Sequence, residues 1–317
     1  MRLLWAALAI STAYGVATAG AQQRPAAVQN WDWCQNKDNQ HALDLQIGGC
    51  TAVIQSGQET PKDTAVAYYN RAIGWRRKGE LDRAIADYDQ AARLDPTNAS
   101  VYYNRGNVWR DKKQYERSIA DYDEAIRLRP DHANAYNNRG NSWRDNGDPD
   151  RAVQDYDQAI RINRDHANAY YNRAGIWERR GEYERAILNY DQVLRIEPDD
   201  VEVWTLRCRL KALLGRSQVA LTDCERALQL KPGDAFALAT RALVRLQLGQ
   251  LPAARGDAEA AVRIAPTDGS KKYVLGIILE AQGDSLGAST AFDEARELAR
   301  PGAWERWERE QGRFRRR

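Results

Sequence analysis

One pattern of small, large apolar and polar positions is repeated along most of the chain with a period of 34 residues. Within each copy, the small or apolar side chains fall at positions 4, 8 and 11 and then at 17, 20, 24 and 27. This spacing places them on one buried face of a helix, first for one helix and then for a second. The copies begin at Ala65, Ala99, Ala133, Ala167, Val201, Ala235 and Gly269.

The apolar face of each copy alternates small and large side chains. Positions 8, 20 and 27 are almost always small, which lets two helices approach closely, because interaxial distance depends on the residues at the crossing. Large side chains fill the remaining space, with Trp75, Trp109, Trp143 and Trp177 at position 11 and Tyr88, Tyr122, Tyr156 and Tyr190 at position 24. Each copy is therefore predicted to be a closely packed pair of antiparallel helices.

The residues between the predicted helices support the same boundaries. Position 15 suits the left-handed residue that follows a helix C-terminus, because it is glycine in every copy except one, where Lys113 stands. In the third copy, Asp148 and Pro149 have the residue types of an N-cap and a first helical position. Prolines also recur at multiples of the period, at Pro96, Pro130, Pro198, Pro232 and Pro266.

A 34-residue period of paired helices is typical of tetratricopeptide repeats, and the chain resembles a tetratricopeptide repeat (TPR) protein over about three quarters of its length. The resemblance implies an all-α fold, a right-handed superhelical solenoid of antiparallel helix pairs. The seven repeats are expected at residues 65–98, 99–132, 133–166, 167–200, 201–234, 235–268 and 269–302.

The two ends of the chain lie outside the period. Residues 1–21 are predicted to be a signal peptide, with Arg2, an apolar stretch at residues 3–10 and small residues at 17–21. The alternative is a membrane anchor, but the apolar stretch is shorter than the roughly 20 residues of a span. No later segment is apolar enough to cross a membrane, so the mature protein is expected to be secreted or periplasmic.

Residues 22–64 are predicted to form a leader, flexible up to Asn30, and a degenerate capping half-repeat whose helix covers residues 43–56. Residues 303–317 are predicted to form a capping helix, with Trp304 and Trp307 on the last repeat, followed by a basic tail. Both segments would cover the open ends that a repeat array must protect.

The four cysteines fall into two pairs, each with a separation of 16 residues, Cys34 with Cys50 and Cys208 with Cys224. Cys208 and Cys224 occupy positions 8 and 24 of the fifth copy, which face each other across the helix pair, close enough for a disulfide. Cys50 falls on the predicted capping helix, and Cys34 would lie on the segment that covers it. Disulfides persist in oxidising compartments. The alternative is four buried thiols that pack as small apolar residues. The spacing lacks the short pairs of a zinc site, so no metal and no cofactor is expected.

A formal net charge of +3 over 317 residues is nearly balanced, which argues against the extended positive field of a nucleic-acid-binding protein. The charges nevertheless follow the repeat. Arginine recurs at position 7 and aspartate at position 23, and these rows are predicted to form ion pairs within or between neighbouring copies. The residues are Arg71, Arg105, Arg139, Arg173, Arg207 and Arg241, and Asp87, Asp121, Asp155, Asp223 and Asp257.

In the TPR family, the first helices of the repeats line a concave groove, and positions 2, 5, 6, 9, 12 and 13 contact the ligand. Carried over to this sequence, the resemblance implies a peptide-binding row of tyrosine, asparagine and arginine side chains in the first four copies. These are Tyr69, Asn70, Arg76, Tyr103, Asn104, Asn107, Arg110, Asn137, Asn138, Asn141, Arg144, Tyr171 and Asn172. The row is similar to the asparagine ladder of O-linked N-acetylglucosamine transferases.

An asparagine side chain has one acceptor and two donors, so it can hold the N–H and C=O of an extended peptide, and the arginines would favour an acidic or carboxylate-ended segment. Alternatively, the asparagines bond neighbouring helices. Copies five to seven carry apolar residues instead, such as Leu206, Val274 and Ile277, and these would bind a second partner or another copy of the chain.

Catalytic motifs are absent from the sequence. His132 and His166 share one loop position in successive copies, as turn residues would, and no nucleophile elbow, HExxH motif or phosphate-binding glycine loop occurs. The prediction is a non-enzymatic scaffold that binds a protein or peptide partner in the cell envelope. A homo-oligomeric structural protein is the alternative, and an envelope enzyme is the least favoured hypothesis.

Overall fold

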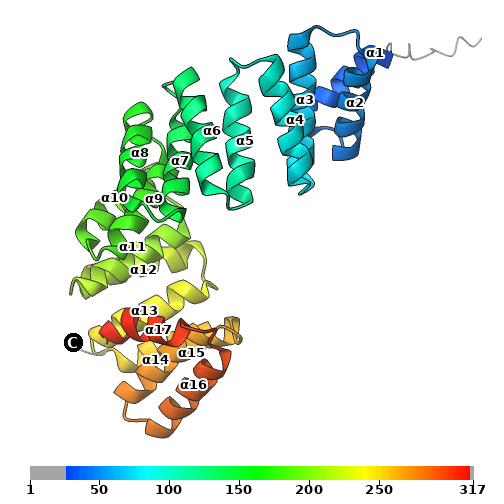
Figure 1. The fold of residues 1–317 in the computed structure, drawn as a ribbon. Coiled ribbons are helices and arrows are strands. Elements are labelled where there is room, and N and C mark those ends of the chain that lie inside the picture. The colour runs from blue at the N-terminus through cyan, green and yellow to red at the C-terminus, as the bar shows by residue number, and fades with distance from the viewer. Residues whose placement is uncertain (1–25, 315–317) are drawn as a thin grey trace, which may run out of the picture. The chain divides into compact units, whose positions relative to one another are not determined.

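The computed structural model describes residues 26–314 (Figure 1). The predicted signal peptide, the start of the leader and the last three residues of the basic tail lie outside this range. Within it, the fold is an all-helical array of paired antiparallel helices with 17 α-helices, two short 3-10 helices and no strand. The described chain forms two compact units, divided between Pro96 and Thr97.

The first unit contains α1 (Ala26–Gln35), η1 (Lys37–Asn39), α2 (Leu43–Ser56), α3 (Pro61–Arg77) and α4 (Leu81–Leu94). Each α-helix packs against the next one along the chain. Helix α2 covers the residues predicted for the capping half-repeat. Helix α3 begins four residues before the first predicted copy, at Pro61, where Thr60 caps it by accepting a hydrogen bond from the N–H of Asp63.

The expected flexible leader is helical from Ala26, so the prediction for residues 26–30 is wrong. The reason is tertiary packing against α2. Gly49 allows the close approach, because a Cβ atom there would lie 2.6 Å from the carbonyl oxygen of Asn30 and 2.7 Å from Cβ of Trp33. The disulfide between Cys34 and Cys50 joins the same two helices. The N-terminal cap is therefore a helix pair and not a half-repeat.

The second unit contains six helix pairs and a C-terminal segment, with adjacent helices packed against each other along the chain. The first helices also contact one another, α5 with α7, α7 with α9, α11 with α13 and α13 with α15, and so form one layer. The helices are α5 (Ala99–Asp111), α6 (Tyr115–Leu128), α7 (Ala133–Asp145), α8 (Pro149–Ile162), α9 (Ala167–Arg179), α10 (Tyr183–Ile196), α11 (Val201–Leu213), α12 (Ser217–Leu230), α13 (Ala235–Gln247), α14 (Leu251–Ile264), α15 (Gly269–Ala281), α16 (Ser285–Leu298), α17 (Ala303–Glu310) and η2 (Gly312–Phe314).

The core of each pair is built from the alternation of small and large side chains. In the second copy, a Cβ atom at Gly106 would lie 2.9 Å from the ring of Tyr122, which is fully buried. Any larger residue would force the two helices apart. The tryptophans at position 11 are less deeply buried. An arginine covers the ring in each of the first four copies, as Arg117 does for Trp109, with 4.8 Å from Cζ to the ring centroid.

The turns inside the pairs have the predicted left-handed residue. The glycine at position 15 has a φ between 72° and 90° in six copies. Lys113 occupies the same position in the second copy with a φ of 58°, so the chain adopts this conformation even without glycine. Asp148 caps α8 as predicted, by accepting a hydrogen bond from the N–H of Arg151 at 3.1 Å.

Candidate functional site

The predicted binding row forms a hydrogen-bonded amide network on α5, α7 and α9. Its centre is Asn138 on α7, whose Nδ2 donates to the hydroxyl of Tyr103 at 3.0 Å and to Oδ1 of Asn107 at 2.9 Å, both on α5. The hydroxyl of Tyr122 also donates to Oδ1 of Asn107, at 2.7 Å. This part of the row therefore ties neighbouring first helices together.

The network continues from α7 to α9. Nδ2 of Asn172 donates to Oδ1 of Asn137 at 3.1 Å, and Nδ2 of Asn137 donates to Oδ1 of Asn138 at 3.0 Å. Asn107 and Asn137 are only 5% and 6% exposed. These two side chains therefore bond neighbouring helices, which is the alternative that the sequence leaves open. They also orient the neighbouring side chains on the layer of first helices.

Other members of the row keep hydrogen-bonding capacity. Oδ1 of Asn141 accepts from the hydroxyl of Tyr156 at 2.8 Å, while its Nδ2 has no acceptor among residues 26–314. Asn172 uses one of its two N–H donors. Arg110 makes no side-chain hydrogen bond or ion pair within the described part of the chain. These three side chains are half-buried, so they are held in place yet reachable from solvent.

Two further members of the row form hydrogen bonds at the edges of the network. Nδ2 of Asn104 donates to the carbonyl of Ser100 in its own helix at 2.9 Å. The hydroxyl of Tyr171 donates to Oε1 of Glu202 on α11 at 2.7 Å. Burial is the main cause that raises the pKa of this phenol, and the hydrogen bond to the carboxylate of Glu202 raises the pKa further. Tyr171 is therefore a neutral donor at physiological pH.

Arg144 brings positive charge to the end of α7. Its Nε donates to Asp145 at 2.8 Å and its Nη1 to Oδ1 of Asn172 at 3.4 Å. Burial by itself would lower the pKa of this guanidinium, but the hydrogen bond to Asp145 and the electrostatic interactions with Asp145 and two nearby tyrosines together outweigh burial, and the net pKa is raised. The charge is permanent, although one carboxylate already compensates for it.

In the first unit, α3 carries the corresponding residues Tyr69, Asn70 and Arg76. The ring of Tyr69 lies edge-on to the ring of Tyr88, with centroids 5.9 Å apart. The backbone carbonyl of Asn70 accepts a hydrogen bond from Nε2 of Gln46 at 2.9 Å. The capping helix α2 therefore lies directly against this part of α3.

The predicted ion pairs between positions 7 and 23 are confirmed in five copies. In each, Nε and Nη2 of the arginine contact both oxygens of an aspartate in the same copy, at 2.6 to 2.8 Å. The pairs are Arg71 with Asp87, Arg105 with Asp121, Arg139 with Asp155, Arg207 with Asp223 and Arg241 with Asp257. Such bidentate pairs fix the angle between the two helices of a copy.

The apolar first helices of the last two copies are covered by the C-terminal segment of the same chain. Trp307 of α17 and Phe314 of η2 belong to one buried cluster with Leu243 on α13 and Val274 and Ile277 on α15. Two cavities of about 370 and 300 Å³ flank Phe314. The expected capping helix is therefore present, and the segment after it also lies on the surface that was expected to bind a second partner.

Both predicted disulfides are formed. The Cα atoms are 4.4 Å apart for Cys34 and Cys50 and 5.5 Å apart for Cys208 and Cys224, and no free cysteine remains within the described residues. Each bridge joins two neighbouring helices at a fully buried position. Disulfides of this kind indicate an oxidising compartment.

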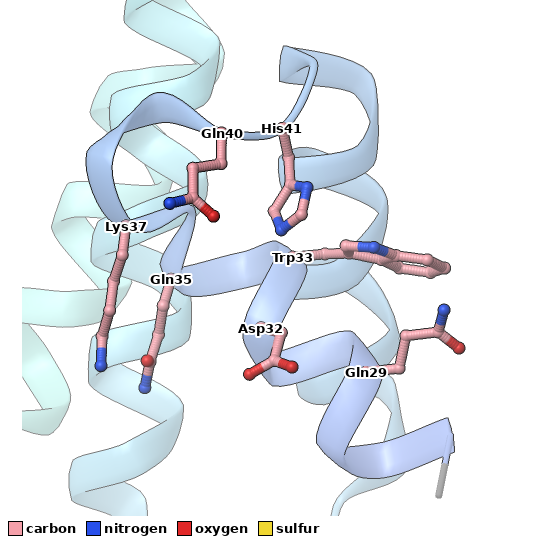
Figure 2. Close-up of a pocket in the computed structure, with 7 residues that line it drawn as sticks. All are labelled: Gln29, Asp32, Trp33, Gln35, Lys37, Gln40 and His41. Carbon is pink, nitrogen blue, oxygen red and sulfur yellow. The ribbon is translucent and has the colours of Figure 1, made fainter. Parts of the chain in front are cut away.

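A polar pocket of about 430 Å³ lies in the N-terminal cap (Figure 2). Its lining comes from α1 and from the segment between α1 and α2. Figure 2 shows the side chain of Trp33 beside that of His41, with Asp32 and Lys37 on the other side of the pocket. No pattern in the sequence predicts this pocket. Over residues 26–314, no group of acidic, histidine or cysteine side chains could hold a metal ion.

None of the helices in the described range is long and apolar enough to cross a membrane. Comparison with solved structures finds the same architecture. A TPR protein from Parabacteroides merdae is 20% identical, with a TM-score of 0.55 over 80% of this chain and 97% of that chain. PilF from Pseudomonas aeruginosa is 20% identical, with a TM-score of 0.55 over 67% of this chain and 93% of that chain. YrrB, described as a TPR protein with an unusual peptide-binding site, is 23% identical, with a TM-score of 0.48 over 60% of this chain and 95% of that chain.

These identities are too low to show more than a shared fold. A comparison with curated proteins finds no significant match. Two family models match the sequence directly. Residues 76–109 and 106–147 match a model described as TPR repeat, and residues 137–201 and 179–235 match one described as tetratricopeptide repeat. Together the matches run from residue 76 to residue 235, half of the chain, and the chain belongs to the tetratricopeptide repeat family.

Proposed function

We propose that the amide network on α5, α7 and α9 binds an extended peptide segment of a partner protein, and that the chain is a non-enzymatic scaffold. Proteins of this family are usually scaffolds for protein–protein interaction and not enzymes. The observation that carries the proposal is the combination of fixed and free amides. Asn107 and Asn137 are buried and hold the row in place, while Asn141 and Asn172 keep free N–H donors beside it.

The chemistry of these groups favours one class of ligand. An amide N–H can donate to a peptide carbonyl, and successive donors on neighbouring helices match a chain that runs along them. Arg110 adds a guanidinium with no carboxylate partner in the described structure, so an acidic side chain or terminal carboxylate of the ligand would complete it. The partner is therefore proposed to be a protein segment that carries negative charge, and not nucleic acid.

The cell envelope is the proposed location. Two disulfides support an oxidising compartment, and the sequence of residues 1–21 supports export with removal of a signal peptide. The alternative of self-association through the last copies has less support. Their apolar residues Leu243, Val274 and Ile277 already pack beneath the C-terminal segment of the same chain.

Site-specific photo-crosslinking in intact cells tests this proposal. A photoreactive residue at Asn141 should trap a partner protein, whereas one at Leu286, which is 81% exposed on α16, should not. The double variant Arg110→Ala and Asn141→Ala should then bind the purified partner at least tenfold more weakly, because it removes a charge-assisted and a neutral hydrogen bond. Identical adducts from both positions, or unchanged affinity of the double variant, would refute the assignment.

A further inference from the structure

The row of ion pairs is interrupted at one place, in the fourth copy. Five arginines at position 7 contact both oxygens of an aspartate at position 23. In the fourth copy, Asn189 occupies position 23 opposite Arg173. An amide has one oxygen where a carboxylate has two, so it cannot form the pair of parallel hydrogen bonds that the aspartates form with the guanidinium. The interruption therefore changes the hydrogen bonding of a permanent cation.

One nitrogen of the Arg173 guanidinium, Nη2, makes no hydrogen bond in the described part of the chain. Its Nε donates to Oδ1 of Asn189 at 2.8 Å, and its Nη1 donates to Asp157 on α8. Nδ2 of Asn189 turns to the carbonyl of Arg185, to which it donates at 2.7 Å. Nη2 of Arg173 has no acceptor within residues 26–314, whereas the same atom donates to an aspartate in five other copies.

Arg173 lines a cavity of about 280 Å³ between α8, α9 and α10. Tyr170 and Trp177 of α9 form aromatic walls, and Leu188 of α10 forms an apolar rim with an exposed fraction of 65%. Gln192 supplies a second donor, because its Oε1 accepts from Arg195 at 3.0 Å and its Nε2 has no acceptor in the described chain. The cavity thus combines apolar walls with free N–H donors.

The charges around the cavity favour the binding of an anion more than the charges at the corresponding site of the third copy do. Arg173 and Arg185 line it together with one carboxylate, Asp157. Arg185 lies over the ring of Trp177, 3.4 Å from Cζ to the centroid, and its Nη1 donates to Glu182 at 2.7 Å. With Asn189 in place of aspartate, the cavity has one negative charge fewer than the corresponding site of the third copy, where Asp155 stands.

We propose that this cavity binds a carboxylate carried on an apolar group. The carboxylate takes the place of the missing aspartate at Nη2 of Arg173, with Gln192 as a second donor, and the apolar group lies against Leu188 and the aromatic walls. A guanidinium N–H forms a strong, charge-assisted hydrogen bond with a carboxylate, and a carboxylate is the anion that five other copies place at this Nη2 atom. The site is separate from the amide network and does not depend on the proposed function.

Isothermal titration of the mature full-length protein tests the site with four probes. N-acetylphenylalanine and a six-residue peptide ending in phenylalanine carry the free carboxylate, and the amidated form of each lacks it. Both acids should bind at least tenfold more tightly than their amides, because the charge-assisted hydrogen bond is lost in the amide. A tighter peptide identifies a polypeptide end as the ligand, and a tighter small acid identifies a free metabolite-sized carboxylate.

The substitution Asn189→Asp is the decisive variant. It restores the residue found in five other copies, so the fold is retained. The new carboxylate would accept a hydrogen bond from Nη2 of Arg173 and leave no free donor there for a ligand. Binding of both acids should fall at least tenfold. Asn146→Asp makes the same change of charge at an exposed turn residue and should leave binding unchanged. Equal binding of acids and amides, absence of binding by either acid, or full binding to the Asn189→Asp variant would overturn the proposal.

Discussion

His166 caps α9 by accepting a hydrogen bond at Nδ1 from the backbone N–H of Ala169, at 3.2 Å. Its Nε2 lies 3.0 Å from Oδ1 of Asn134, so the ring is neutral with its proton on Nε2. Burial lowers the pKa of His166 below its ordinary value of 6.5, while a hydrogen bond with its own backbone opposes this in part. The cap is therefore lost when the ring takes up a second proton.

A dependence of stability on pH follows. Because the folded pKa lies below the unfolded pKa, the contribution of His166 is complete above about pH 6.5 and is lost as the pH falls through the folded pKa. A helix cap contributes about 1 kcal/mol. The variant His166→Asn keeps a capping acceptor that does not titrate, so its midpoint of urea unfolding should fall less than that of the wild type between pH 7.5 and pH 5. Equal falls would contradict this role of His166.

Lys113 gives a second prediction. It adopts a φ of 58° at a turn position where six other copies have glycine. A side chain in this conformation costs roughly 1–2 kcal/mol, and the greater entropy of unfolded glycine offsets about 0.4–1 kcal/mol of this. Lys113→Gly should therefore raise the free energy of unfolding by about 0.5–1 kcal/mol.

The matched control is Gly147→Ala, at a φ of 90° and with open space around the added Cβ atom. It introduces the strain without a clash and should lower the midpoint of urea unfolding. If the two substitutions shift the midpoint in the same direction, backbone strain at this turn is not the cause.

The sequence period predicted the helix pairs because the same alternation of small and large residues is repeated at every crossing. Helix α1 was missed because it lies outside the period, and it becomes helical through contact with α2 at Gly49. The bonding of the asparagines could not be predicted either. Whether Asn137 faces solvent or bonds Asn138 and Asn172 depends on the distance between first helices and on side-chain rotamers. Asn189, in contrast, was readable as a break in the aspartate row, although its effect on Arg173 required the structure.

The disulfide between Cys208 and Cys224 stabilises the fifth copy. The sixth copy has Ala242 and Ala258 at the same two positions, so the double variant Cys208→Ala and Cys224→Ala fits the fold without a bridge. Closing a loop of this length contributes about 3 kcal/mol in the chain-entropy model, and the variant should unfold at a lower urea concentration. Reductant should lower the wild-type midpoint further, because it also opens Cys34–Cys50. Alkylation of the untreated protein at any cysteine would contradict the bridges.

Phe314 should hold the C-terminal segment on the last two copies. Its side chain is 2% exposed among Leu243, Val274 and Ile277, and truncation of a buried phenylalanine to alanine costs about 3–5 kcal/mol in a core. At a chain end the loss appears as local opening and not as global unfolding. Phe314→Ala should therefore speed tryptic cleavage after Arg306 and Arg309 at least tenfold, with little change in the midpoint of urea unfolding. Leu286→Ala, at an exposed residue, should change neither quantity, and an unchanged cleavage rate for Phe314→Ala would show that Trp307 and α17 hold the segment without it.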